Sequence, residues 1–169
     1  MSSTETETPA ETDTRPFRER VVDGGAQVIA FRLGGELHAC DIALVEEVVT
    51  RRTVHPLPDM PPRLLGVLRL RGELVPVLDL APLLDMTLQQ AERPAVLVVP
   101  FGESRIGIAA DAADEVMSVA AEAFRPAPHT GGDRDHYVVG LARLEDRLVN
   151  LIDLAEMLRA QATLNGNER

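Results

Sequence analysis

The chain has 169 residues, a formal net charge of −10 and no lysine, so every one of its basic side chains except histidine is an arginine. This length suits one ordinary domain, or two very small ones that share a core, and it excludes a large multidomain enzyme. The acidic balance argues against nucleic acids and anionic membranes as direct partners, because both are held mainly by cationic side chains.

At the two ends of the chain, the composition predicts mobile segments. Residues 1–24 are rich in Ser, Thr, Glu and Pro, so they bury too little apolar surface to offset their ordering entropy. Residues 162–169 are also predicted to fray. The sequence shows no signal peptide, and its longest apolar run, AVLVVPF, is too short to span a bilayer. We therefore expect a cytoplasmic protein without direct membrane insertion.

Between these ends, residues 25–161 have the pattern of a mainly β domain. Short apolar runs with a period near two are broken by Gly, Pro and Asp. Pairs of such runs flank four turn dipeptides, which predicts hairpins at Gly34-Gly35, Arg71-Gly72, Gly102-Glu103 and Glu145-Asp146. Helical spacing follows Asp41 and Asp153, so we predict a short helix after each aspartate with that residue as its N-cap.

An internal repeat is the strongest signal in the sequence. A shift of 74 positions aligns Gly66–Leu84 with Gly140–Leu158 without a gap, and nine of the nineteen pairs are identical. The identical pairs are Gly66/Gly140, Arg69/Arg143, Leu70/Leu144, Leu74/Leu148, Val75/Val149, Asp79/Asp153, Leu80/Leu154, Ala81/Ala155 and Leu84/Leu158. The sequence therefore predicts a duplicated unit of some 65 to 75 residues.

Two copies of so small a unit are expected to share one apolar interface, because each copy alone buries a modest share of its surface. We predict two small barrels with a boundary near residue 90 and a partner-binding cleft between them. The strand ELVPVLD of the first copy carries Pro76, where the second copy has Asn150. Since proline has no N–H to donate, Pro76 predicts an edge position for this strand.

Few side chains in the sequence are arranged for catalysis. CxxC, HExxH, GxSxG, GxGxxG, P-loop and EF-hand patterns are all missing. Asp79 and Asp153 resemble a carboxylate pair, but each follows a strand and precedes a helical pattern at equivalent positions of the repeat. This placement favours N-capping over acid-base chemistry, so we expect no enzymatic activity and no cofactor.

The four histidines and the single cysteine are further candidates for chemistry. His38 lies in a strand pattern and His55 opens a proline-rich connector, so structural or solvated roles suit both. The setting of Cys40 predicts a small buried hydrophobe rather than a reactive thiol. Four potential metal ligands lie in the segment HTGGDRDH: His129, Asp133, Asp135 and His136. Its glycine-rich character favours a solvated loop, and a small metal-dependent enzyme built on it is the alternative.

Two charged runs remain, Glu46-Glu47 and the arginines of LRLRG. A solvated face explains most such runs. Arg71, however, breaks the internal symmetry, because its partner in the second copy is Glu145. A charge that is inverted between copies is not explained by the shared fold, so Arg71 is a candidate functional residue.

Six segments follow one another along the chain: VEEV, a proline-rich connector, GVLRLRGELVPVLDL, GIAADAADEV, FRPAP and YVVGLARLEDRLVNLIDLAEML. In this order they resemble the CheW family of chemotaxis coupling proteins, from about Gln27 to Leu158. The resemblance implies two SH3-like five-stranded β-barrels with short connecting helices and a C-terminal helix, and it allows a strand to be exchanged between the barrels.

The same resemblance implies a non-catalytic adaptor. It would couple the cytoplasmic tips of methyl-accepting chemoreceptors to the regulatory domain of a CheA-type histidine kinase. Such an adaptor is a monomer when free and alternates with the kinase in rings that bridge receptor clusters. The receptor is expected in the groove between the barrels, and the kinase at the barrel edges.

By this resemblance, receptor coupling falls to Val45 and Glu47 of VEEV and to Arg71 of LRG, with Gly72 as the turn that orients Arg71. We expect Glu47 and Arg71 to pair. The alternative is that this pair only fixes the shape of the first barrel. Residues that contact the kinase carry no motif and stay unassigned.

Two features depart from the family pattern. Arg69 stands where the family commonly has Asn, and the N-terminal segment is longer than a minimal adaptor needs. The first leaves the choice of receptor open, and the second leaves room for a docking segment. The sequence does not separate flagellar chemotaxis from surface motility or another output, nor from a diverged copy that binds receptor but not kinase.

Overall fold

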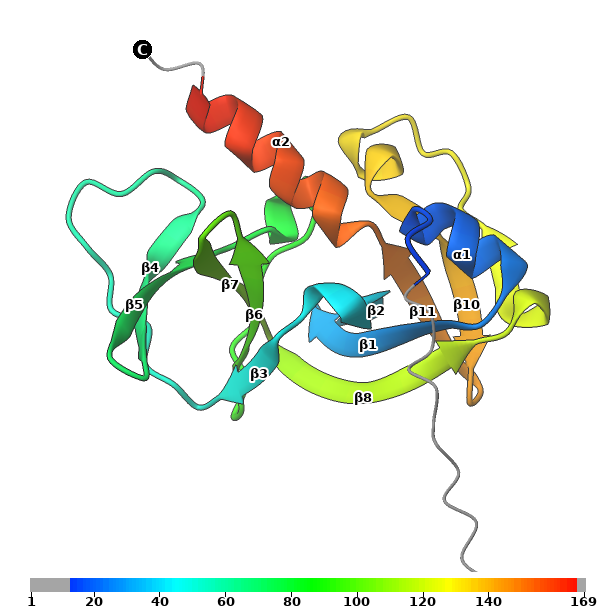
Figure 1. Ribbon diagram of the computed structural model, residues 1–169, viewed down its shortest axis with the longest axis horizontal. Coiled ribbons are helices and arrows are strands. Elements are labelled where there is room, and N and C mark those ends of the chain that lie inside the picture. The colour runs from blue at the N-terminus through cyan, green and yellow to red at the C-terminus, as the bar shows by residue number, and fades with distance from the viewer. Residues whose placement is uncertain (1–12, 167–169) are drawn as a thin grey trace, which may run out of the picture.

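The computed structural model describes residues 13–166, with side chains through Gln161. Its strands form two sheets, which lie side by side as two barrels (Figure 1). The first barrel has the strand order β3-β6-β7-β5-β4: β3 (Glu47–Thr50), β6 (Ala95–Phe101), β7 (Ser104–Ala110), β5 (Glu73–Leu78) and β4 (Leu64–Leu70). The second has the order β8-β1-β2-β11-β10-β9: β8 (Ala112–Val119), β1 (Ala26–Leu33), β2 (Glu36–Asp41), β11 (Arg147–Ile152), β10 (Val138–Leu144) and β9 (Phe124–Pro126). The predicted mainly β fold with two SH3-like subdomains is confirmed. The second barrel has six strands rather than the expected five, because the short strand β9 pairs with β10.

Helices occupy the connections and both ends of the described chain. The α-helices are α1 (Phe17–Asp23) and α2 (Leu154–Gly166), and α2 crosses above the junction of the two barrels (Figure 1). The short 3-10 helices are η1 (Ile42–Leu44), η2 (Ala81–Leu84), η3 (Ala121–Ala123) and η4 (Asp133–His136). All three aspartates predicted as caps accept a backbone hydrogen bond: Asp41 Oδ1 from Ala43 N at 3.1 Å, Asp79 Oδ1 from Ala81 N at 3.0 Å, and Asp153 Oδ1 from Glu156 N at 3.1 Å.

All four predicted hairpins form, but two of them, β1–β2 and β6–β7, join the barrel that is formed mainly by the other half of the chain. The β1–β2 hairpin joins the C-terminal strands of the second barrel, whereas β6–β7 completes the first barrel. The first barrel therefore spans residues 47–110, and the second combines residues 26–41 with residues 112–152. A boundary near residue 90 does not separate the barrels, because the two copies exchange a whole hairpin.

The internal repeat appears in the backbone in atomic detail. The register of β4 against β5 shifts between Leu64 and Gly66, and that of β10 against β11 shifts between Val138 and Gly140. A Cβ atom on Gly66 would lie 2.3 Å from His55 O, and one on Gly140 would lie 2.6 Å from Arg125 O. Both glycines are therefore required because another backbone segment, the connector at His55 or strand β9, passes close to the bulge.

Three apolar clusters hold the molecule together. One lies inside each barrel, and the central one joins the two sheets and α2 through residues such as Phe31, Leu97 and Met157. Phe31, Leu97 and Met157 are each at most 1% exposed. The shared apolar interface predicted from the repeat is confirmed, because residues of both barrels and of α2 belong to this central cluster.

The N-terminal end departs from its prediction. Residues 17–23 fall in the segment predicted to be a mobile tail, yet they form α1, whose Phe17 and Val21 enter the core of the second barrel. The spacing of these two residues, i and i+4, places them on one helix face. At the other end, α2 continues to Gly166, beyond the start of the segment predicted to fray.

Pro76 is also placed differently from its prediction. Its strand β5 is flanked by β4 and β7, so it is not an edge strand. Val67, the partner of Pro76 on β4, exchanges both of its backbone hydrogen bonds with His55. The missing N–H of Pro76 therefore falls on the β7 side, where pairing begins only at Val77. The proline is tolerated because it lies just before the parallel ladder begins.

Candidate functional site

Glu47 and Arg71, the two predicted site residues of opposite charge, meet at one end of the first barrel. Glu47 begins β3, and its backbone lies opposite Val98 of β6. Arg71 and Gly72 form the tight turn between β4 and β5, with φ angles of 50° and 82°. The turn carries Arg71 toward β3, although 24 residues separate it from Glu47 in the sequence.

The contact between them is bidentate. Arg71 Nη1 donates to Glu47 Oε1 at 2.8 Å, and Arg71 Nη2 donates to Glu47 Oε2 at 2.9 Å. The Glu47 side chain is 25% exposed and that of Arg71 is 67% exposed. Glu47 is thus fixed at the surface, while one side of the guanidinium remains open to a partner. The predicted pairing is confirmed.

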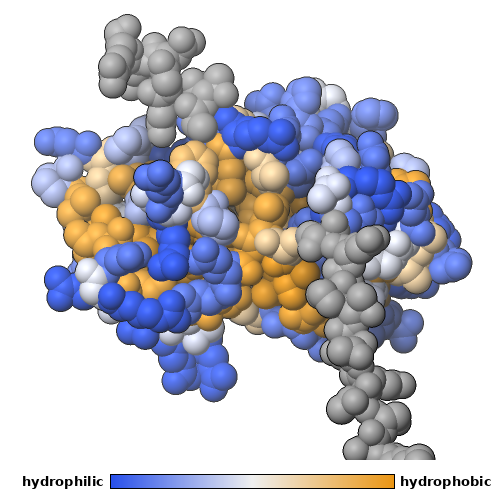
Figure 2. Space-filling view, viewed as in Figure 1, coloured by the Kyte–Doolittle hydropathy of each residue, from blue (hydrophilic) through white to orange (hydrophobic). Residues whose placement is uncertain are grey.

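Val45 connects this charged pair to the apolar centre of the molecule. It caps η1 in an extended conformation, two residues before Glu47, and its half-buried side chain packs on the central core. Val48 of β3 packs on the same core. Figure 2 shows apolar surface across the middle of this face, in the region where the barrels meet, with hydrophilic side chains around it. Val45 packs on the apolar core and Glu47 pairs with Arg71, so apolar and charged groups lie two residues apart here.

A second set of charges flanks the pair. Arg105 of β7 contacts Glu46 at 2.7 Å and Glu73 at 3.2 Å. Glu73 follows the Arg71-Gly72 turn, so the turn is connected to β3 and β7 by guanidinium groups on both sides. Exposed pairs of this kind add little stability individually, but together they restrict the conformations of the turn.

The equivalent end of the second barrel carries the opposite arrangement. Val48 lies opposite Leu97 and Val116 lies opposite Ile29, so β3 and β8 are equivalent and Glu115 corresponds to Glu47. The position of Arg71 is taken by Glu145. A hydrogen bond with the Glu145 carboxyl, aided by charge repulsion, raises the pKa of Glu115. The sequence showed the inverted charge at Glu145 but not the glutamate that it faces.

Arg147 partly neutralises this acidic cluster. Its Nη1 lies 3.2 Å from Asp114 Oδ2, and its Nη2 donates to Glu115 Oε1 at 2.8 Å. Arg147 takes the position that Glu73 has in the first barrel. The two barrels therefore exchange the signs of both turn-proximal charges.

The buried histidine and cysteine have structural roles. His38 is 0% exposed, and burial lowers its pKa to about 4. One ring nitrogen, Nε2, lies 3.3 Å from Leu33 O. Cys40 is fully buried, and desolvation raises the pKa of its thiol. The small buried hydrophobe predicted at Cys40 is confirmed.

The loop with four potential metal ligands is ordered by one of them. Asp135 accepts hydrogen bonds from Thr130 Oγ1 at 2.7 Å, from Thr130 N and from Gly131 N, and these bonds lower its pKa. The His129 side chain is 97% exposed, with Nδ1 3.9 Å from Asp135 Oδ2. Within residues 13–166, no group of three or more His, Cys, Asp or Glu side chains is placed to hold a metal ion.

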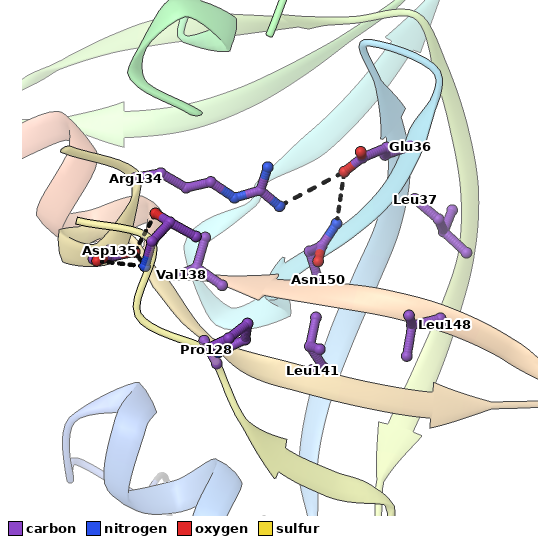
Figure 3. A pocket seen from close by; sticks show the side chains of 11 residues that line it. Glu36, Leu37, Pro128, Arg134, Asp135, Val138, Leu141, Leu148 and Asn150 are labelled. Atoms are coloured by element: carbon purple, nitrogen blue, oxygen red, sulfur yellow. Dashed lines mark hydrogen bonds and ion pairs between the residues drawn. The ribbon is translucent and has the colours of Figure 1, made fainter. Parts of the chain in front are cut away.

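Two hollows on the outer face of the second barrel could not be foreseen from the sequence. One, of about 420 Å³, lies between β2, β10, β11 and the loop before β10, and Figure 3 shows Arg134 and Asn150 directed at Glu36 on its wall. The other, of about 600 Å³, lies beside η3 and β9. Leu141 and Leu148 line both hollows, so the two adjoin.

Comparisons with known proteins identify the family to which this two-barrel architecture is similar. The CheW-like domain family matches residues 27–162, which span both barrels. A chemotaxis protein CheW from Klebsiella aerogenes is 32% identical over 139 residues, covering 81% of this chain and 84% of the relative. A chemotaxis protein CheW from Rhizobium meliloti is 28% identical, covering 80% and 89%.

Solved structures agree with the sequence relatives. The crystal structure of the scaffolding protein TtCheW from Thermoanaerobacter tengcongensis superposes with a TM-score of 0.64 at 25% identity, covering 76% of this chain and 89% of that protein. None of the helices in the described part of this chain is long and apolar enough to cross a membrane. The paired barrels and these matches show that the chain belongs to the CheW-like domain family.

Proposed function

We propose that this chain is a non-catalytic cytoplasmic adaptor that couples chemoreceptors to a CheA-type histidine kinase. Membership of the CheW-like family, over a match that includes both barrels, is the observation that carries the proposal. It supports a scaffold role in chemotaxis, as do the names of the relatives. Asp41 and Asp153 cap helices and Glu47 forms a surface ion pair with Arg71, and such roles suit a binding module.

Receptor coupling is assigned to Val45, Glu47 and Arg71, with Gly72 holding the turn. Three observations support this assignment. Glu47 and Arg71 form a preorganised bidentate pair, Val45 adds an apolar contact beside it, and the Arg71 guanidinium keeps 67% of its side chain exposed. A fixed arginine beside apolar surface suits a helical receptor tip that offers a carboxylate next to a large apolar residue.

Reconstitution with receptor membranes and kinase tests the proposal. We expect this chain to co-sediment with receptors and to change the rate of kinase autophosphorylation. Arg71→Ala should reduce receptor binding several-fold and leave the melting temperature nearly unchanged, because surface pairs contribute less than about 1 kcal/mol. Arg143→Ala is the matched control, since Arg143 is an exposed arginine on β10 of the other barrel.

The other outcomes are distinct. If Arg71→Ala lowered the melting temperature while receptor binding stayed intact, the pair would serve only the shape of the first barrel. Receptor binding without any change in kinase rate would indicate a copy that binds receptors but not kinase. No co-sedimentation and no change in kinase rate would contradict the adaptor role altogether. A flagellar output is distinguished from surface motility by swimming and surface-spreading assays of a deletion strain.

A further inference from the structure

We propose that the acidic N-terminal segment, residues 1–12, docks on the outer face of the β10–β11 hairpin and covers Leu148. This inference does not depend on the adaptor role. The face is defined here by five residues that line the two adjoining hollows: Arg125, Leu141, Arg143, Leu148 and Asn150.

The face is apolar at its centre and open to solvent. Leu148 is 64% exposed, and the half-buried Leu141 lies beside it in both hollows. Figure 3 shows Leu141, Leu148 and Pro128 on one side of the first hollow and the Arg134, Glu36 and Asn150 contacts on the other. An extended segment laid across the hairpin would contact both hollows and shield Leu148 from water.

Positive charge at this face lacks carboxylate partners in the described part of the chain. Arg143 lies directly opposite Leu148 on the hairpin and makes no hydrogen bond or ion pair with residues 13–166. Arg125 donates only to backbone carbonyl oxygens, those of Glu122 and Phe124, at 2.8 and 2.7 Å.

Most carboxylates at the same face are already engaged. Glu36 lies 3.6 Å from Arg134 and accepts from Asn150 at 3.1 Å, and Asp135 accepts from Thr130 and Gly131. Glu122 is the remaining carboxylate that lines the hollows. The two hollows are thus lined by three arginines and three carboxylates, and among these arginines Arg125 and Arg143 have no carboxylate contact within the described residues. These two guanidinium groups are the positions at this face that suit the carboxylates of an acidic segment.

The N-terminal segment is tethered next to this face. Helix α1 lies against η3, which lines the second hollow, and Arg18 of α1 donates to His136 O at 2.8 Å, next to the loop that lines the first. Twelve residues reach at most about 40 Å when extended. Tethering gives the segment an effective concentration in the millimolar range, so weak contacts suffice for docking.

The chemistry of the segment matches the face. Residues 1–12 carry Glu5, Glu7 and Glu11 and no arginine, and Pro9-Ala10 precedes Glu11. This order presents small apolar groups beside a carboxylate, as Leu148 stands beside Arg143. The pairing is electrostatic and partly apolar, so salt should weaken it.

The first barrel supplies a matched control face. Arg69 lies opposite Leu74 as Arg143 lies opposite Leu148, and both leucines are 64% exposed. Helix α1 lies beside the second barrel, at the opposite end of the molecule from β4 and β5 (Figure 1). The same chemistry is therefore present on a barrel that the segment is not anchored to.

Spin labelling of the full-length chain tests the proposal. Cys40 is buried, so a nitroxide can be attached selectively to a Ser3→Cys variant. We expect the label to broaden the methyl NMR signals of Leu148 and Leu141 strongly and that of Leu74 little. The broadening at Leu148 should be lost in about 1 M salt, where the Debye length is about 3 Å. It should also be lost in Glu5→Gln/Glu7→Gln/Glu11→Gln and in Arg143→Gln, but not in Arg69→Gln.

Three results would overturn the proposal. The first is equal broadening of Leu74 and Leu148, or none at either leucine. The second is broadening at Leu148 that persists after the three glutamates are neutralised. The third is broadening that passes from spin-labelled chains to separate isotope-labelled chains in a mixture, because the occupant would then be a second copy.

Discussion

The two barrels share a turn whose backbone is nearly the same and whose charge is reversed. In the first barrel Arg71 and Gly72 have φ angles of 50° and 82°, and in the second Glu145 and Asp146 have 50° and 62°. Arg71 is held by Glu47, whereas Glu145 faces the equivalent Glu115. The barrel fold thus requires the turn geometry but neither sign of charge.

This difference separates what the fold needs from what is left for recognition. Positions that are equivalent and alike, such as Gly66 and Gly140, have structural reasons in both barrels. For positions that are equivalent but opposite in charge, such as Arg71 and Glu145, the shared fold gives no reason for either charge. A CheW-like chain can therefore present a cationic turn residue in one barrel and an acidic one in the other on a nearly symmetric scaffold.

The largest effect is expected from filling the two bulge glycines. Gly66→Ala places a Cβ within 2.3 Å of His55 O at a φ of +154°, so overpacking and backbone strain should together cost about 4 kcal/mol. Gly140→Ala should cost about 3 kcal/mol, because its Cβ meets Phe124 and Arg125 O. Urea unfolding measures both free energies.

Gly132→Ala is the control for this pair, because its Cβ would have no neighbour closer than 3.5 Å. It should change the unfolding free energy by less than about 0.5 kcal/mol. If one bulge variant unfolded only its own barrel, the two barrels would be independent units, contrary to the shared central core.

A buried histidine in the second barrel, without a counterpart in the first, makes the stability of the protein depend on pH. The register places His38 where the first barrel has Ile106, since His38 lies opposite Phe31 and Ile106 lies opposite Val99. The pKa of His38 is lowered from 6.5 to about 4, so the unfolded chain binds its proton first as the pH falls. Stability from this group is present above pH 6.5 and decreases toward pH 4, by about 3 kcal/mol in all.

His38→Ile copies the first barrel and should flatten this part of the stability profile. Urea unfolding of both proteins across the acid range measures the difference. If the two profiles stayed parallel between pH 6.5 and 4, the protonation of His38 would not be coupled to folding.

The smallest effects come from exchanging the turn charges. Arg71→Glu should lower the unfolding free energy by less than about 1 kcal/mol, since it replaces an exposed ion pair with two like charges. Glu145→Arg should raise the midpoint of urea unfolding, because it gives Glu115 the partner that Glu47 already has. Both changes should shrink at high salt.

Asp146→Arg adds the same charge one position away and serves as the control. An equal gain from Asp146→Arg and Glu145→Arg would show that only the net charge matters. In that case a specific contact between the introduced guanidinium and Glu115, like that between Arg71 and Glu47, would not contribute to the free energy of unfolding.

Local features of the fold were predictable from the sequence. The hairpins at Gly34-Gly35 and Arg71-Gly72, and the caps at Asp41 and Asp153, depend on residues close together in the chain. The exchange of hairpins was not predictable in this way, because alternation of apolar and polar residues predicts a strand but not the sheet that the strand will join. Helix α1 was missed because Phe17 and Val21 are its only large core residues in a highly charged segment.

The candidate site was predictable in part. The resemblance pointed to Glu47 and Arg71, and their contact follows the prediction. Glu115 was missed because its relation to Glu47 depends on an offset of 68 residues, whereas the repeat of the hairpin turns has an offset of 74. The two hollows that Leu148 lines were not predictable, because the first is closed by the loop before β10, which lies outside the repeat. No short motif marks them.

The exchanged hairpin also sets the order in which the protein can be completed during synthesis. Residues 26–41 leave the ribosome first, but their sheet partners lie in residues 112–152. The first barrel is complete once residue 110 has emerged, whereas the second must wait for nearly the whole chain. The β1–β2 hairpin therefore lacks its partner strands β8 and β11 until late in translation, and its edges are open to non-native pairing for that time.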